Sequence, residues 1–266
     1  MNTATRADVA AEAVPVQFGN PLSLLVSPLL WSSVGYLVAY LLLGALWFAA
    51  TLTALLAGGI TSIFVIGLPI LAAGLAVIRV LASVERIRVP QPLGGPIASP
   101  YLPARTGFRA DLAGRVQDPA TWRDVVLLLI LWPVLFILDV IALVVWLIGW
   151  GLISLPFWYQ YPPQTFNNGV KAHGTQIGYY KHGPHQGPHY GWFIDDLRSS
   201  LIAAGVGALV VLVVGNYLLV GVAKLHASIT RGLLGPSQPS TLGAVLLEQA
   251  AADDRLLDLR RALADE

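Results

Sequence analysis

The histidines between residues 173 and 189 are the side chains of this chain best suited to metal or proton binding. They lie in a polar segment that includes the run KHGPHQGPHYGW, and they are His173, His182, His185 and His189. Neutral imidazole is a good ligand for Zn²⁺, Cu²⁺ or Ni²⁺, and Asp195 or Asp196 could add an oxygen ligand. Imidazoles also gain charge as the pH falls through about 6.5. The segment therefore predicts a transition-metal or pH-sensing site, and the alternative is a turn-rich loop whose imidazoles are simply solvated.

Asp139 is the second residue that could do chemistry, because it lies deep in an apolar run. A carboxylate in hydrocarbon is costly, so Asp139 should be protonated, paired, or turned toward the interior of a helical bundle. One interpretation is a signal relay or a proton-coupled step. The other is a neutral carboxyl that bonds across the bundle to Asn216, Tyr217, Thr51 or Thr53.

Apolar helices must position these groups. The chain is 56% hydrophobic and 12% charged, and no charged side chain occurs between Glu12 and Arg79. One crossing needs about 20 apolar residues to span about 30 Å of hydrocarbon. The apolar runs then predict an all-α membrane protein with four transmembrane helices, at about residues 31–56, 60–81, 125–153 and 201–222.

Glycine and proline indicate where these helices turn or bend. Gly58 and Gly59 suit a tight reversal between the first two crossings, since glycine tolerates positive φ. Pro69 and Pro133 fall inside the second and third crossings, where a proline removes a backbone donor and bends a helix.

The distribution of Lys and Arg predicts the orientation. Of the 16 Lys and Arg residues, only Lys171, Lys181 and Arg198 lie between the third and fourth crossings. The positive-inside rule then places both termini and the central loop in the cytoplasm. The Gly58-Gly59 turn and the histidine-bearing loop would face the outside.

These elements divide the chain into three parts: an N-terminal tail over residues 1–30, a four-helix domain over 31–235, and a cytoplasmic tail over 236–266. Within the domain, the outer loop covers about 156–198 and the cytoplasmic loop about 82–123. In that cytoplasmic loop Arg105, Arg109, Arg115 and Arg123 suit a short amphipathic helix at the membrane surface. The C-terminal tail has leucines at helical spacing and acidic residues, which favour an amphipathic helix that binds a protein rather than lipid. The alternative is a solvated, partly frayed helix with no partner.

Several function classes are excluded or disfavoured by composition. The chain has no cysteine, so thiolate nucleophiles and cysteine-ligated metals are absent. A net charge of +1 gives no reason to expect a nucleic-acid partner. The GxSxG, HExxH and P-loop motifs are missing, so we expect no enzyme activity.

Five segments in order resemble a known family. They are AYLLLGALWF, IGLPIL, VERIRVP, DPATWRDVVLLLILWPVLF (Asp118 to Phe136) and KLHASITRGLLGP (Lys224 to Pro236). Together they are similar to the putative sensor domain that begins many bacterial two-component histidine kinases and is also found alone. The resemblance covers about residues 35–236. After Pro236 the chain has about thirty residues and no histidine, so a kinase domain is not expected.

The resemblance implies a multi-pass protein of the bacterial cell membrane that works as a sensor-like signalling module without a catalytic domain. The outer loop would receive an input, and the C-terminal helix would pass it to a histidine kinase or another membrane protein. We also expect a homo-oligomer. We expect no resident cofactor apart from the transition metal considered above. The alternatives are a structural or assembly subunit of a membrane complex, and a small transporter built around Asp139.

Overall fold

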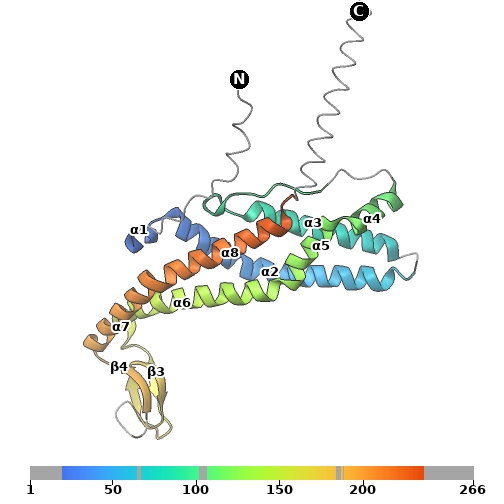
Figure 1. The fold of residues 1–266 in the computed structure, drawn as a ribbon. Helices are drawn as coiled ribbons and strands as arrows, with labels where there is room; N and C mark the ends of the chain where they lie inside the picture. The colour runs from blue at the N-terminus through green and yellow to red at the C-terminus, as the bar shows by residue number, and fades with distance from the viewer. Residues whose placement is uncertain (1–19, 65–66, 102–106, 184–186, 188, 237–266) are drawn as a thin grey trace, which may run out of the picture.

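Four long apolar helices dominate the fold (Figure 1). The computed structural model describes residues 20–64, 67–101, 107–183, 187 and 189–236. Within these residues, four helices are long and apolar enough to cross a membrane, as predicted. They are α2 (Pro28–Thr61), α3 (Gly67–Arg88), α6 (Trp132–Trp158), and α7 (Leu197–Leu209) continued through the π-helical segment Val210–Gly215 into α8 (Asn216–Leu234).

The shorter elements complete the described chain. The short α1 (Pro21–Leu25) precedes α2, within residues predicted to be tail. The connection between α3 and α6, predicted to be the cytoplasmic loop, holds a 3₁₀ turn (Gln91–Leu93), α4 (Phe108–Gln117) and α5 (Pro119–Val125). A short helix is present in this loop as α4, with Leu112 buried and Phe108 exposed, but its amphipathic character stays a prediction; Arg123 lies on α5, and Arg105 falls outside the described residues. The predicted C-terminal helix also lies outside them.

The reversal between α2 and α3 was predicted at the wrong residues. α2 runs through Gly58 and Gly59 to Thr61, and the chain turns after Ser62. A Cβ built at Gly58 would lie 2.9 Å from the Cα of Leu71, so this glycine serves close helix packing. Pro69 lies in the first turn of α3, where its missing N–H costs nothing and no bend is needed.

The third crossing does not start as one continuous α-helix. Asp118 caps α5 by accepting a hydrogen bond from the Ala120 amide, and Pro119 begins that helix. The π-helical segment Val126–Ile130 then joins α5 to α6, with the Leu131 amide bonded to the Val126 carbonyl. Pro133 sits just beyond it, in the first turn of α6. The wider π turn accommodates Pro133, which has no backbone N–H and would otherwise bend the helix.

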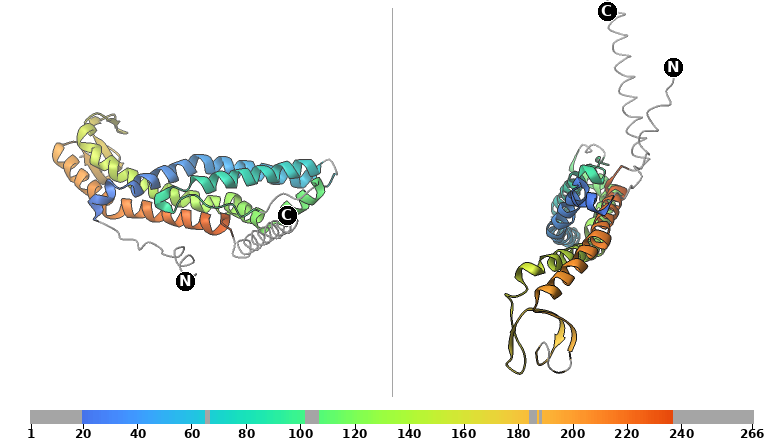
Figure 2. Two further views of the ribbon diagram at one scale, coloured as in Figure 1. Left: turned by 90° about the horizontal axis from the view of Figure 1, so that it is seen from above. Right: turned by 90° about the vertical axis from the view of Figure 1, so that its left-hand side faces the viewer.

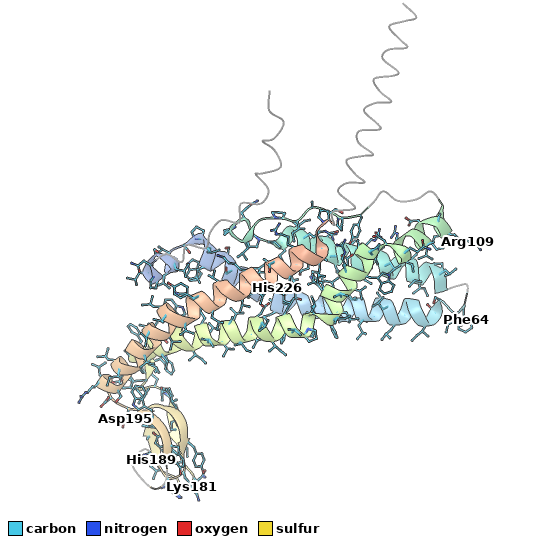
Figure 3. All side chains as sticks on the ribbon, viewed as in Figure 1. Phe64, Arg109, Lys181, His189, Asp195 and His226 are labelled. Carbon is cyan, nitrogen blue, oxygen red and sulfur yellow. The ribbon has the colours of Figure 1, made fainter. Side chains whose placement is uncertain are left out.

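The helices form two pairs, α2 with α3 and α6 with α7–α8 (Figure 2). α2 and α6 are antiparallel where they meet: the Trp31 and Trp146 ring centroids are 6.0 Å apart, and those of Phe48 and Trp132 are 4.6 Å apart. Phe64, at the α2–α3 turn, therefore lies at the opposite end of the molecule from Lys181 and His189 (Figure 3). The sequence predicted that this turn and the histidine-bearing loop face the same side of the membrane. The structure places them at opposite ends of the molecule, because α2 and α6 are antiparallel and staggered.

The all-α prediction was incomplete in the connection between α6 and α7, which was predicted to be the outer loop. This connection contains two antiparallel hairpins: β1 (Pro163–Thr165) with β2 (Lys171–His173), and β3 (Thr175–Tyr180) with β4 (His189–Ile194). Phe166, Tyr180 and Phe193 form a small core between them. The glycine-rich composition indicated turns, but Gly178 and Gly191 face each other in the strands, where a Cβ on either would clash with backbone.

The α6–α7 crossing yields a first prediction. A Cβ at Gly207 would lie 2.6 Å from the Gly149 carbonyl oxygen and 2.9 Å from the Ile153 amide nitrogen, and backbone cannot move aside cheaply. Gly207→Ala should therefore lower the free energy of unfolding by about 1–3 kcal/mol. Gly205→Ala, where a Cβ meets nothing within 4 Å, is the matched control and should stay within about 1 kcal/mol of the parent. Unfolding in mixed detergent micelles measures both, and equal effects would contradict this account of the crossing.

Candidate functional site

Asp139 is completely buried, and its partner is His226 on α8. The Nδ1 of His226 lies 3.1 Å from Oδ2 and 3.3 Å from Oδ1 of Asp139. His226 is 1% exposed, so the pair is enclosed by the bundle. Asn216, one of the partners suggested by the sequence, accepts a hydrogen bond from the Trp146 indole instead. Asp139 is thus paired across the bundle, as its position required, but with a residue that sequence analysis missed.

Two tyrosines of α2 enclose the imidazole of His226. The ring centroids of Tyr36 and Tyr40 lie 5.1 and 4.2 Å from that of His226, both edge to face. Two buried polar atoms here, His226 Nε2 and the Tyr40 hydroxyl, have no hydrogen-bond partner within the described part of the chain, and the Tyr36 hydroxyl has Thr230 as its neighbour. Buried polar groups are normally paired, so this under-satisfied cluster has more than one way to arrange its hydrogen bonds.

A second carboxylate joins the cluster from α3. Glu85 is fully buried and accepts hydrogen bonds from the Trp47 indole (2.7 Å) and from Arg88 Nη2 (2.7 Å). Arg88 also donates to the Tyr36 carbonyl oxygen, and its guanidinium lies 4.4 Å from the Tyr36 ring centroid. The polar cluster therefore consists of Tyr36 and Tyr40 of α2, Glu85 and Arg88 of α3, Asp139 of α6, and His226 of α8.

The charges of this polar cluster cancel only when the Asp139–His226 pair holds one proton beyond the fully deprotonated carboxylate and neutral imidazole. Glu85 and Arg88 form one ion pair, and Asp139 is neutralised only when His226 is protonated or when Asp139 itself takes the proton. An unpaired charge in an apolar bundle is strongly unfavourable. A proton at the Asp139–His226 pair therefore decides whether the cluster is balanced.

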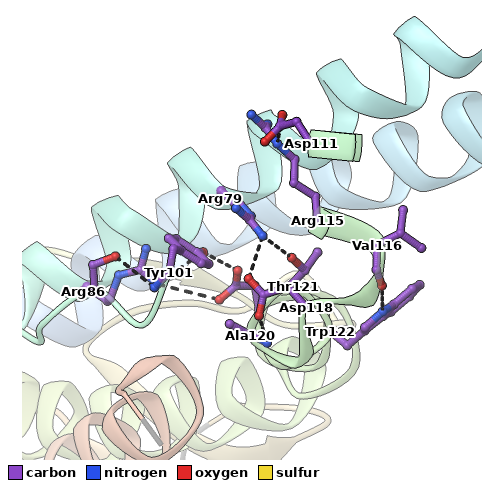
Figure 4. Close-up of polar contacts among 12 residues, drawn as sticks. Arg79, Arg86, Tyr101, Asp111, Arg115, Val116, Asp118, Ala120, Thr121 and Trp122 are labelled. Atoms are coloured by element: carbon purple, nitrogen blue, oxygen red, sulfur yellow. Dashed lines mark hydrogen bonds and ion pairs between the residues drawn. The ribbon is translucent and has the colours of Figure 1, made fainter. Parts of the chain in front are cut away.

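The conspicuous sequence segments VERIRVP and DPATWRD meet in a second cluster, the motif latch, formed by Arg79, Arg86, Tyr101, Asp118, Thr121 and Asp124 (Figure 4). Arg79 Nη2 lies 2.8 Å from Asp118 Oδ2 and 3.0 Å from Thr121 Oγ1. The guanidinium carbons of Arg79 and Arg86 lie 4.4 and 4.7 Å from the Tyr101 ring centroid. The latch thus joins α3 to α5 through the tyrosine of the intervening loop.

Asp124 is the buried acid of the motif latch. It accepts a hydrogen bond from the Tyr101 hydroxyl through Oδ2, and Arg86 Nη1 lies 3.7 Å from Oδ1. Burial raises the pKa of Asp124 to about 6, although Tyr101 and Arg86 favour the charged form. Burial likewise raises the pKa of Tyr101. A carboxyl with this pKa can gain or lose a proton near neutral pH.

The histidines of the outer loop do not come together in the described structure. His173 lies on β2, and His189 begins β4 with its ring stacked 5.2 Å from that of Tyr180. His185 lies outside the described residues, and within them no three His, Asp or Glu side chains form a group that could hold a metal. Asp196 caps α7 through Ser199, and this hydrogen bond lowers the pKa of Asp196. The metal or pH-sensing site over His173, His182, His185 and His189 stays a prediction.

The sequence did contain a signal for His226. It lies in the fourth long apolar helix, and within the described residues it is the one fully buried histidine. The hydroxyl of the nearby Ser228 points away from it and donates to the Leu225 carbonyl oxygen. Pairing the isolated intramembrane acid with the histidine of another helix would have identified the site.

The comparisons with known proteins give one match. A family model described as "Putative sensor" matches residues 36–234, which is most of the chain. No curated protein and no solved structure matches it. The matched range begins at Tyr36 and ends at the last residue of α8, so it includes both the polar cluster and the motif latch.

The raised pKa of Asp124 predicts a pH dependence of stability. Its unfolded-state pKa is near 3.8 and its folded-state pKa about 6, so the folded protein binds the proton more tightly between these values. The contribution of Asp124 to the free energy of unfolding therefore falls as the pH rises from 3.8 to about 6, and is constant above that. Thermal unfolding in detergent across this range should show the fall in the parent and lose it in Asp124→Asn. Asp111→Asn, at an α4 surface pair, should keep it, and an unchanged profile in Asp124→Asn would contradict the assignment.

The Asp139–His226 pair predicts non-additive substitutions. Asp139→Leu or His226→Leu alone leaves a buried polar partner without its pair, at an expected cost of about 3–5 kcal/mol in unfolding free energy. The double variant removes both groups and should cost clearly less than the sum of the two single variants. Ile141→Leu, on the exposed face of α6, is the control and should have little effect. Strictly additive losses in detergent unfolding would show that the pair is not coupled.

Proposed function

This chain belongs to the family described as "Putative sensor", and from that premise we propose that it is a membrane-embedded signalling module that relays an extracytoplasmic input to a separate protein. It has a sensor-like role by family and carries four helices able to span a membrane. In this proposal the chain itself catalyses no reaction and holds no cofactor that the relay requires. The output is made by the partner.

The observation that carries the proposal is that all four long helices contribute to the polar cluster. α2 supplies Tyr36, α3 supplies Arg88, α6 supplies Asp139 and α8 supplies His226. Movement of any one helix changes the pairing of groups on the other three, and unpaired buried groups are costly. Such a cluster favours a few discrete packings over continuous deformation, and an input can shift their populations if it binds one packing more tightly.

The charge distribution supports an orientation for this relay. We place the loop 82–123 and both termini in the cytoplasm, and the loop 156–198 outside, by the positive-inside rule. The last part of α8 lies beside the loop 82–123, since Ala227 packs in one cluster with Val89 and Leu93 of that loop. Arg231 of α8 also donates to the Gly95 carbonyl oxygen of that loop.

These contacts indicate which end of the molecule would contact the partner. α8 ends at Leu234, which is fully buried beside the α3–α5 region that the motif latch holds. A shift of α8 at His226 is therefore carried along one helix to the point where residues 236–266 begin. We propose that this C-terminal segment contacts the partner, a histidine kinase or another membrane regulator, while the outer loop with His173, His182, His185 and His189 receives the input.

Cross-linked affinity purification tests the proposal. The full chain, a version ending at Pro236, and a full chain carrying Ile141→Leu as a matched control are expressed in parallel, and bound proteins are identified by mass spectrometry. We expect a kinase or other regulator with the full chain and with the control, and at least a tenfold loss of it without residues 237–266. Recovery of the same regulator by both lengths would place the contact elsewhere. Recovery of subunits of a membrane complex, or of no other protein, would favour a structural or a transport role instead.

A further inference from the structure

The β3–β4 hairpin presents an apolar face that is largely exposed. The register sets Ile177 opposite Trp192 and Tyr179 opposite Tyr190. Residues directly opposite, and residues two apart on one strand, share a face of a sheet. These four side chains therefore form one face, here called the aromatic face. Tyr190 is 80% exposed, Tyr179 57% and Ile177 41%.

The other side of the hairpin already supplies its core. Tyr180 and Phe193 point to that side and are buried with Phe166. The aromatic face carries no charged residue, whereas Lys171 and Lys181 stand at the ends of neighbouring strands. A soluble loop would gain nothing by exposing two tyrosines, an isoleucine and part of a tryptophan together.

The base of the hairpin is fixed to the ends of two spanning helices. α6 ends at Trp158 and β1 begins at Pro163, while β4 ends at Ile194 and α7 begins at Leu197. Ile194 is fully buried against Leu155 and Ala203, and Trp192 packs on the same cluster. The strands then turn away from the direction of α6 (Figure 1), so the hairpin projects sideways from the end of the helix pair rather than extending it.

The helix end beside the hairpin carries the same kind of residue. Phe157 is 80% exposed, Tyr161 68% and Trp158 37%. Tyrosine and tryptophan concentrate where a helix leaves the hydrocarbon, because their rings are apolar and their N–H or O–H groups can reach the polar headgroups. Two strands at this level with an uncharged Tyr/Trp face match the chemistry of the lipid headgroup layer, and nearby lysines can reach lipid phosphates.

We propose that the aromatic face of the β3–β4 hairpin lies in the interfacial layer of the bilayer and anchors the outer loop to the membrane surface. The occupant of this face is lipid, not a second protein. Anchoring fixes the level of the hairpin relative to the ends of α6 and α7, whatever signal the chain carries. This inference does not depend on the proposed relay.

The absence of cysteine makes the test direct, because a single introduced cysteine carries a nitroxide label without background. Labels are placed at Tyr190→Cys and at Tyr179→Cys, since both side chains are exposed. Asn167→Cys, in the exposed turn between β1 and β2, is the water reference, and Val213→Cys, exposed on the fourth long helix, is the hydrocarbon reference. The full chain is reconstituted into phosphatidylcholine–phosphatidylglycerol vesicles, and power-saturation EPR measures access to oxygen and to a water-soluble nickel chelate.

Labels at 190 and 179 should have an oxygen-to-nickel access ratio between those of the two references, at least threefold above that at 167. A ratio equal to that of the water reference at both positions would overturn the proposal. A label that is immobile and shielded from both reagents would also overturn it, because protein and not lipid would then cover the face.

Discussion

Asp139 and Glu85 place two carboxylates inside an apolar helical bundle, and the cost of leaving either unpaired governs how the four long helices can pack. Each acid has its base on a defined element: Glu85 on its own helix through Arg88, Asp139 across the bundle through His226. The first pair binds α3 to α2, because Arg88 also bonds the Tyr36 carbonyl oxygen. The second binds α6 to α8. The aromatic rings of Tyr36 and Tyr40 lie between the two pairs and bring them into one unit.

α3 connects this unit to the loop 82–123. Its charged residues fall into two sets with different partners: Glu85 and Arg88 face α2, while Arg79 and Arg86, seven residues apart, contact Tyr101, Asp118 and Asp124. A helix of about 3.6 residues per turn gives two such faces when charges are spaced by three and by seven. The polar cluster and the motif latch are therefore two sides of one helix, so neither can shift without the other.

The parts of this structure that follow from local composition could be predicted from the sequence. The parts that depend on contacts between residues far apart in the chain could not. Long uncharged runs indicated four spanning helices, and the rarity of an acid in such a run singled out Asp139. The partner His226 was missed, because nothing local marks a histidine as facing another helix. Strands β3 and β4 were missed for a similar reason: their glycines signalled turns, and only the pairing of Gly178 with Gly191 shows that they belong inside strands. Gly58 was predicted to form a turn, whereas it lies inside α2 and allows α2 and α3 to approach each other closely.

The two π-helical segments, Val126–Ile130 and Val210–Gly215, have a consequence for helix phase. A π turn holds one more residue than an α turn, and each residue advances a helix by about 100°. Each segment therefore rotates everything beyond it relative to the preceding helix. Deleting a single residue from 126–130 would restore a regular helix and turn Asp118 and Asp124 away from Arg79 and Arg86. The widened turns thus let the lipid-facing surface and the polar surface of one continuous span be oriented independently.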